Sequence, residues 1–353
     1  MTSMLESENR LRRPVGTVAV GIDGIQYLRG IAALMVAAHH ARHYFPDVAT
    51  WSSFGSRGVD IFFVISGFIM AHTTASYRVA DGRVSQTVDF VLKRFVRVVP
   101  LYWIALLWTG KRTFVNGEIS ADALKDFAFI PHFHAIYTGS IFPSLVPGWT
   151  INYEVFFYLL FAISMLFGRR RYWVLFSVMS CLILLGLLDW KSAAGIFYTS
   201  NILLEFLLGT ITYWLVWRRP VAGSRLWSML FTLAGFALLA IENGDMNRGL
   251  LDGPFAALIV GSVVLWAQGL KLDWLRAIGD ASYAIYLFHL ASFWIAGAVL
   301  HSVKVEDPSP LNIALVLATH LAIAVGAGLL IHRLLERPLL QLLRRGNRTS
   351  IVS

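Results

Sequence analysis

Ten long apolar segments, separated by shorter polar ones, are the feature that most restricts how this 353-residue chain can fold. Each is close to the roughly 20 residues that an α-helix needs to cross the hydrocarbon of a bilayer. Backbone polar groups must be satisfied internally in hydrocarbon, which favours helices. We therefore predict an all-α polytopic membrane protein, a bundle of about ten transmembrane helices. The segments are 25–45, 58–76, 95–110, 149–168, 172–189, 199–217, 226–242, 250–269, 279–301 and 311–334.

The amino-acid composition agrees with a membrane protein and argues against a soluble domain. Hydrophobic residues make up 57% of the chain and charged residues only 14%, which is unlike soluble domains. The formal net charge is +9, but the Lys and Arg residues occur in short clusters between the apolar segments. A nucleic-acid site would need them along one stripe or patch, so we expect the lipid bilayer, and no nucleic acid, as a partner.

The distribution of Lys and Arg predicts the orientation of the segments. With successive loops on opposite sides of the bilayer, one side holds 21 of these residues and the other holds 8, and Arg29 remains inside the first segment. Basic loops are retained in the cytoplasm, so we expect both termini there. The predicted organisation is a cytoplasmic tail at 1–24, a transmembrane domain at 25–338 and a second cytoplasmic tail at 339–353.

The first apolar segment contains ionisable residues where apolar ones are expected. Arg29 lies near its start, and His39 and His40 lie far along it. Ionisable groups in hydrocarbon are costly and are therefore candidates for function. Arg29 and His40 are eleven residues apart, a rise of roughly 16 Å and about 20° from three full helical turns. They share one helix face at different depths, whereas His39 points about 100° away and is expected to be structural.

The same two residues carry a resemblance to a known family. Arg29, ten intervening residues and His40 resemble the Arg-X10-His signature of the membrane acyltransferase-3 family. Each motif alone is a weak signal, but six motifs in the family's order across most of the chain are a specific signal for the family. Among its members, this sequence most resembles those that modify exopolysaccharides. The five further matching stretches are GVDIFFVISGF at 58–68, KRFVRVVPLYW at 93–103, WTINYE at 149–154, SYAIYLFH at 282–289 and ERP at 336–338.

The resemblance implies a membrane O-acyltransferase of the bacterial cytoplasmic (inner) membrane. Such an enzyme moves an acyl group, expected here to be acetyl, from acyl-CoA to a hydroxyl of a bacterial polysaccharide or its lipid-linked repeat unit. Acetyl-CoA or another acyl-CoA would be the co-substrate, and the lipid-linked or nascent glycan the acceptor. Two alternatives remain open: acylation of a small secondary metabolite, and a non-catalytic component of a glycan transporter.

His40 is the residue that we expect to be the catalyst. A neutral imidazole can remove the proton of an attacking hydroxyl, or it can accept the acyl group itself, and the sequence does not choose between these roles. Asp60 and Glu154, and also Glu205, lie at a similar depth in their segments. Asp60 or Glu154 is expected to hold the required tautomer of His40, as an orienting carboxylate does in other catalytic sites. The alternative is a structural histidine bonded within the bundle.

Arg94 and Arg97 are the expected contacts of the donor phosphates. Residues three apart are neighbours on a helix face, and paired guanidinium groups suit phosphate recognition. The alternative is anchoring to anionic lipid headgroups, and the resemblance implies acyl-CoA instead. Arg29 is expected to contact the phosphates or the pantetheine arm, and its alternative is snorkelling to the headgroups.

Tyr283, Tyr286 and His289 recur every three residues, so one continuous helix would present them on a single face. We expect them to line the donor channel, although such stripes are also common in packing. The long connection at 111–148 is either a lid over an outward cavity or a supporting interfacial loop. No metal is expected, because the histidines are scattered and lack the carboxylate or cysteine neighbours of a zinc site.

Overall fold

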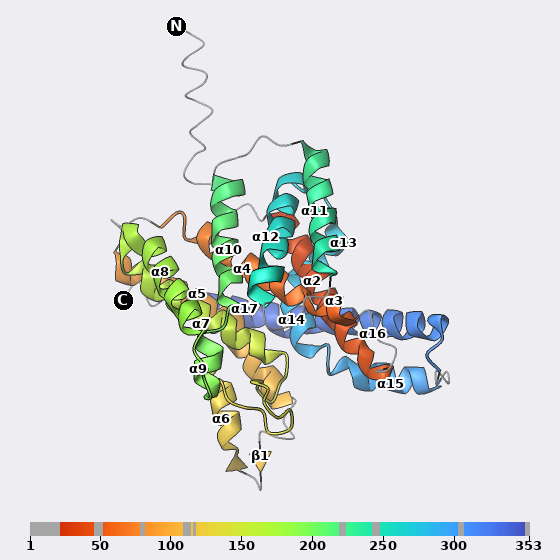
Figure 1. Ribbon diagram of the computed structural model, residues 1–353. Helices are drawn as coiled ribbons and strands as arrows, with labels where there is room; N and C mark the ends of the chain where they lie inside the picture. The colour runs from red at the N-terminus through yellow and green to blue at the C-terminus, as the bar shows by residue number, and fades with distance from the viewer. Residues whose placement is uncertain are drawn as a thin grey trace.

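The computed structural model describes residues 22–45, 52–77, 82–108, 114–115, 118–218, 224–241, 248–302 and 307–349. Most of the tail expected at 1–24, and residues 350–353 of the second tail, lie outside the described residues. The regular secondary structure of the described part is helical apart from one antiparallel pair of two-residue strands, β1 (Phe114–Val115) and β2 (Glu118–Ile119). Figure 1 shows α10, α11 and α12 side by side in one layer, and α16 running across them at a steep angle.

The α-helices are α2 (Asp23–His40), α3 (Ser52–Ser56), α4 (Gly58–Thr73), α5 (Arg83–Trp108), α6 (Ala121–Phe127), α7 (Gly148–Met165), α8 (Arg171–Leu185), α9 (Ala193–Tyr198), α10 (Leu203–Thr212), α11 (Arg225–Leu239), α12 (Arg248–Trp266), α13 (Asp273–Asp280), α14 (Ser282–Phe288), α15 (Ser292–Ser302), α16 (Pro310–Ile331) and α17 (Arg337–Thr349). Short 3₁₀ segments are η1 (Ala41–Tyr44) and η4 (Gly168–Arg170), and π-helical segments are η5 (Tyr213–Arg218) and η6 (His332–Glu336).

All ten expected segments fall on described helices, but ten membrane spans are not confirmed. Within the described ranges, four continuous helices are long and apolar enough to cross a bilayer, and the bent pair α14 and α15 would be a fifth. Helices α8 and α11 have only 15 residues each, and α5 carries several basic residues among its apolar ones. The four continuous helices are Phe54–Thr73, Ala193–Arg218, Arg248–Trp266 and Pro310–Leu343.

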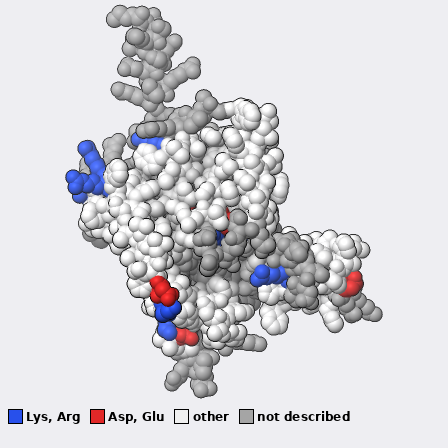
Figure 2. Space-filling view, viewed as in Figure 1, with Lys and Arg blue, Asp and Glu red and all other residues white. Residues whose placement is uncertain are grey.

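The outward surface of these helices suits lipid rather than water. Large apolar side chains are strongly exposed, among them Leu187 at 84% and Trp294 at 80%. Figure 2 shows that most of the described surface on this face is uncharged, with Lys, Arg, Asp and Glu confined to a few small groups. An apolar surface of this extent on a monomer marks contact with an apolar medium, so the coarse prediction of a helical membrane protein is supported.

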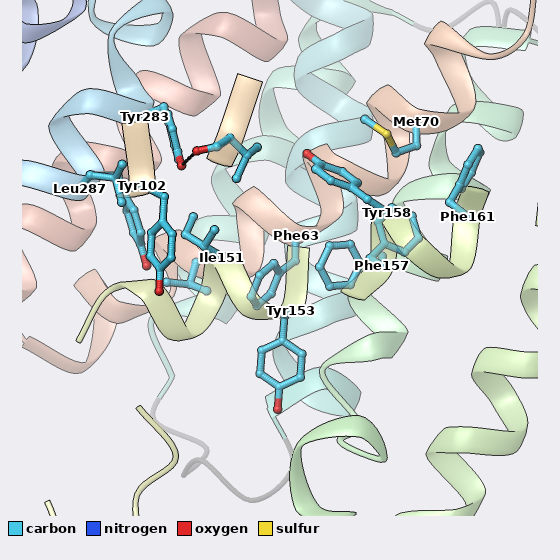
Figure 3. Close-up of a cluster of buried hydrophobic side chains, with 14 of the residues drawn as sticks. Phe63, Met70, Tyr102, Ile151, Tyr153, Phe157, Tyr158, Phe161, Tyr283 and Leu287 are labelled. Carbon is cyan, nitrogen blue, oxygen red and sulfur yellow. Dashed lines mark hydrogen bonds between the residues drawn. The ribbon is translucent and has the colours of Figure 1, made fainter. Parts of the chain in front are cut away.

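Helix α4 is the centre of the bundle and packs against α2, α10 and α12. Its contact with α10 is close because both helices place a glycine there: a Cβ atom on Gly67 would lie 2.0 Å from the carbonyl oxygen of Phe206, and one on Gly209 would lie 2.0 Å from that of Val64. Small residues allow such approach between membrane helices. Beside this contact Phe63 and Phe157 pack against α10 (Figure 3), each with its ring against that of Phe206.

The ninth segment is broken, which corrects the expectation of one continuous helix. Helices α14 and α15 meet at an angle of 69°, and His289 lies at the break. The Ser292 hydroxyl donates to the carbonyl oxygen of His289 at 2.5 Å, and a side chain that bonds a helix carbonyl locally competes with the helical ladder. The chain therefore changes direction at His289, one helical turn after Tyr286.

The long connection before α7 contains more structure than expected. Helix α6 is capped by Ser120, whose hydroxyl accepts from the Ala123 N–H, and the Asp126 carboxylate accepts from the Ser144 N–H at 2.9 Å. Burial raises the pKa of the Asp126 carboxyl above its ordinary value, while the bond from Ser144 acts in the opposite direction. This bond ties the end of the connection to α6.

We predict that Gly67→Ala destabilises the protein by about 1–3 kcal/mol, the usual cost of overpacking a core. The added methyl group would press on the backbone of α10, which has no flexible side chain to move aside. Gly326→Ala in α16 is the matched control, because a Cβ atom there meets nothing within 4 Å. Thermal unfolding in detergent measures both, and equal melting temperatures for the two variants would contradict the close α4–α10 contact.

Candidate active site

A cavity of about 510 Å³ lies between α2, α4, α5, α7 and α14. It brings together residues from five of the six sequence motifs, all but ERP at 336–338. Apolar side chains, including Phe62, Phe63 and Ile151, form much of its wall, and the polar side chains are clustered. Of the nine expected site residues, it contains Arg29, Arg94, Arg97, Glu154, Tyr283 and Tyr286.

The three arginines of the cavity have no acidic partner among the residues described. Arg29 donates only to the Gln26 side chain at 3.3 Å, and Arg94 only to the Thr73 hydroxyl at 3.4 Å. The Nε atom of Arg94 is buried without a hydrogen-bond partner, and Arg97 makes no ion pair in the described ranges. Lys93, by contrast, is exposed and paired with Asp89 at 2.6 Å. The cavity thus holds three guanidinium groups and one carboxylate, that of Glu154, and this excess of positive charge suits an anionic ligand.

Glu154 and the tyrosines form the polar middle of the cavity. Ser66 donates to the Glu154 carboxylate at 3.1 Å, and Tyr158 donates to the same oxygen. Figure 3 shows Tyr283 and Tyr158 on opposite sides of this region, and the dashed line marks the bond from the Tyr283 hydroxyl to the Val98 carbonyl oxygen, 2.7 Å long. Glu154 therefore lines the cavity and does not approach His40.

Tyr286 lies where the cavity approaches the expected catalyst. Its hydroxyl donates to the Pro147 carbonyl oxygen at 3.1 Å and is bonded to Thr150. Its ring lies 6.0 Å from that of His289, which in turn lies 4.8 Å from the ring of His40. His40 and His289 thus form a pair just beyond the cavity wall at Tyr286.

The hydrogen bonds of this pair determine where its protons lie. The Nδ1 atom of His289 faces the Tyr286 carbonyl oxygen at 2.6 Å, and a carbonyl only accepts, so this nitrogen carries the proton. In a neutral His289 the Nε2 atom is then an acceptor, and it lies 3.1 Å from the Nδ1 atom of His40. That Nδ1 also faces the Val36 carbonyl oxygen at 3.0 Å.

Both contacts of the His40 Nδ1 atom require it to donate, so the proton of neutral His40 lies on Nδ1. Its Nε2 atom then carries a lone pair, and no described residue forms a hydrogen bond with it. An imidazole in this tautomer is a base or a nucleophile at Nε2. Two groups fix this tautomer of His40: the His289 ring and the Val36 backbone carbonyl.

Asp60 does not take the orienting role that the sequence suggested. It is fully buried, and its two oxygens accept from Arg248 at 2.7 and 2.8 Å. Arg57 forms a second buried ion pair with Asp252 at 2.6 Å. Neither Asp60 nor Glu154 forms a hydrogen bond with His40 in the described part of the chain, because ion pairing holds the first in place and Ser66 and Tyr158 hold the second.

Glu205 lies beside these two ion pairs as a third carboxyl group. It is fully buried, its side chain approaches that of Asp60, and its oxygens receive no hydrogen bond from the described residues. The group therefore contains two arginines, Arg57 and Arg248, and three carboxyls. Burying an uncompensated charge is costly, so the charges of the group balance when one of its three carboxyls is protonated.

Comparison with known proteins decides the family. The family model described as an acyltransferase domain matches residues 22–331. The chain belongs to the acyltransferase-3 family. This match contains all nine expected site residues, and no solved structure matches the chain.

Three curated relatives illustrate the range of this acyltransferase family. The exopolysaccharide production protein ExoZ of Rhizobium meliloti is 33% identical over 89% of this chain and 95% of its own length. The acyltransferase MdmB of Streptomyces mycarofaciens is 24% identical over 92% of this chain and 93% of its own. The O-acetyltransferase OatA of Staphylococcus aureus is 24% identical over 79% of this chain, which spans about half of OatA.

Several groups of this acyltransferase escaped the sequence analysis. Arg57 and Arg248 lie at the ends of apolar segments, where a basic residue is ordinarily a topology signal, and their buried acidic partners lie far away in sequence. Tyr158 follows Glu154 by one helical turn, and this spacing could have predicted the hydrogen bond between them. His289 was expected to line the donor channel and instead contacts His40.

The acyltransferase should lose about 3–5 kcal/mol of stability with Arg248→Gln, because removing one partner leaves a buried ion pair uncompensated. Glu205→Gln should leave stability nearly unchanged if Glu205 is neutral. Arg276→Gln, which breaks a more exposed pair with Asp23, is the control and should cost about 0–1 kcal/mol. Thermal unfolding in lipid nanodiscs measures all three, and a loss with Glu205→Gln as large as that with Arg248→Gln would indicate an ionised Glu205.

Proposed function

We propose that this acyltransferase moves an acyl group, with acetyl the first candidate, from acyl-CoA to a hydroxyl of a bacterial polysaccharide or its lipid-linked repeat unit. The observation that carries the proposal is the course of one cavity, which runs from three arginines that form no ion pair with a described residue to Tyr286, beside the His40–His289 pair. The names of ExoZ and OatA support an exopolysaccharide context and O-acetylation.

The donor fits the charge pattern of the cavity. CoA carries phosphates at its nucleotide end and a thin, mostly neutral pantetheine arm that ends in the thioester. Arg29, Arg94 and Arg97 would bind phosphate by forked hydrogen bonds, and the less polar wall along Phe62 and Tyr283 would take the arm. The thioester then lies toward Tyr286, next to the histidines.

The proposal assigns the two ends of the site to the two sides of a bacterial inner membrane. The excess of Lys and Arg on alternate loops supports cytoplasmic termini and ten spans. With both termini in the cytoplasm, the arginines would lie at the cytoplasmic end of the site and the histidines toward the outer side. A donor in the cytoplasm would then acylate an acceptor on the outer side, and the whole coenzyme would not have to cross the membrane.

His40 acts through its Nε2 atom in this proposal. The atom takes the proton of the acceptor hydroxyl while the hydroxyl oxygen forms a bond to the acyl carbon. The carbon–sulfur bond then breaks, and the thiolate of CoA takes that proton. His289 and the Val36 carbonyl accept from Nδ1 throughout, which stabilises the transient imidazolium as an orienting carboxylate does elsewhere. Attack by Nε2 on the thioester itself is the covalent variant of the same role.

Removing the catalyst or the phosphate contacts should affect different steps. We expect His40→Ala to lower turnover of radiolabelled acetyl-CoA at least a hundredfold while donor binding is retained, and Arg94→Ala with Arg97→Ala to weaken donor binding. Lys93→Ala and His301→Ala are matched controls outside the site and should behave like the native chain. The assay uses purified protein in lipid with and without a glycan extract.

Unchanged turnover in His40→Ala would refute the catalytic assignment. Donor binding without consumption by any form would favour the transporter alternative instead.

Substitution of His289 separates orientation from donor binding. Loss of a hydrogen bond to a charged group costs about 1.5–3 kcal/mol, so His289→Leu should lower kcat roughly tenfold to a hundredfold. His289→Gln retains an acceptor and should lose less. Steady-state kinetics against acetyl-CoA distinguishes the roles: a rise in KM with kcat unchanged would contradict the orienting role and return His289 to the donor channel.

A further inference from the structure

A second cavity adjoins the first at its arginine end. It has a volume of about 280 Å³ and lies between α2, α5, α13, η6 and α17. It shares Gln26, Arg29 and Arg97 with the larger cavity. The residues that it adds to the shared ones are Asp280, His332, Glu336, Arg337 and Leu340. The shared walls make the two cavities neighbouring parts of one site.

The acidic groups of this second cavity are already engaged. Asp280 accepts from the Gln26 amide at 2.8 Å, and Glu336 is bonded to the His332 ring at 2.7 Å. Arg97 and Arg337 form no ion pair with any residue that the structure describes. The cavity therefore presents three guanidinium groups, those of Arg29, Arg97 and Arg337, against two carboxylates, and this excess of positive charge suits an anion site.

The two cavities together suit a ligand with two separated anionic groups. Arg29 and Arg97 stand at the boundary, Arg94 lies in the larger cavity, and Arg337 lies only in the smaller one. Two phosphate groups, one in each cavity, would each have an arginine of their own and would share Arg29 and Arg97. The apolar side chain of Leu340 adds a surface for a flat ring beside Arg337.

We propose that the second cavity binds the 3′-phosphate end of the donor nucleotide, with Arg337 as its specific contact and Arg97 shared with the diphosphate. This rests on the proposed use of acyl-CoA as donor. The ERP motif, which lies inside the continuous helix Pro310–Leu343, then has a role in donor recognition. An anionic lipid headgroup has the same phosphate chemistry, so the test must separate the two sources.

The test compares two donors, acetyl-CoA and acetyl-dephospho-CoA, which lacks only the 3′-phosphate. In nanodiscs of neutral phosphatidylcholine, Arg337→Gln should raise KM for acetyl-CoA about tenfold, the usual scale for losing one charge-assisted hydrogen bond. It should leave kcat and the KM for acetyl-dephospho-CoA unchanged. Arg333→Gln is the matched control, since Arg333 is exposed on η6, four residues before Arg337, and lines neither cavity.

An equal change for both donors, or no change for either, would overturn the proposal. The lipid arm repeats the native and Arg337→Gln measurements with phosphatidylglycerol added. A KM for acetyl-CoA that rises with phosphatidylglycerol in the native protein and not in the variant would assign the cavity to a headgroup and would also overturn it.

Binding of adenosine 3′,5′-bisphosphate by calorimetry keeps this proposal separate from the proposed function. It is measured on His40→Ala with and without Arg337→Gln, where no turnover is needed. Binding that Arg337→Gln weakens about tenfold supports the nucleotide site even if acetyl transfer fails. Equal binding by both forms, or none by either, contradicts the site even if acetyl transfer is observed.

Discussion

Ionised side chains inside a membrane bundle are stable only when another charge or a ligand compensates them, and this constraint separates the arginines of the structure into two groups. Arg57 and Arg248 have buried acidic partners and join α4 to α12 at one end of the bundle. Arg29, Arg94, Arg97 and Arg337 have no ion pair with the described residues, although they line cavities. The first group joins two helices of the fold, and the second places guanidinium groups at cavity walls, where an anionic ligand would compensate their charge.

The histidine pair depends on two departures from regular helix packing. The chain breaks between α14 and α15, which leaves the Tyr286 carbonyl bonded to His289 rather than to the next helical turn. His40 lies at the last residue of α2, where its ring reaches back to the Val36 carbonyl. These two backbone carbonyls fix both tautomers without a carboxylate beside His40. The carboxylates that the sequence offered serve other partners: Asp60 in an ion pair and Glu154 in the cavity.

The sequence predicted the membrane class and the family, because apolar segments of span length and six ordered motifs are local signals. It also predicted most of the cavity, since Arg29, Arg94, Arg97, Glu154, Tyr283 and Tyr286 belong to those motifs. It did not predict the contact between His40 and His289, which are 249 positions apart and meet through a helix break that hydropathy cannot reveal. The pairing of Asp60 with Arg248 was also missed, because the two residues lie far apart in sequence. The number of spans depends on helix lengths, which hydropathy overestimated for α8 and α11.

The central claim is that donor and acceptor reach opposite ends of one site. The most direct measurement uses protein reconstituted in one orientation into sealed vesicles, with acetyl-CoA supplied on one side and the glycan acceptor on the other. The account predicts acetylated acceptor when the donor is on the side of Arg94 and Arg97, with free CoA released on that same side, and no product when the two substrates are exchanged. Product formed only when both substrates are on the same side would contradict it.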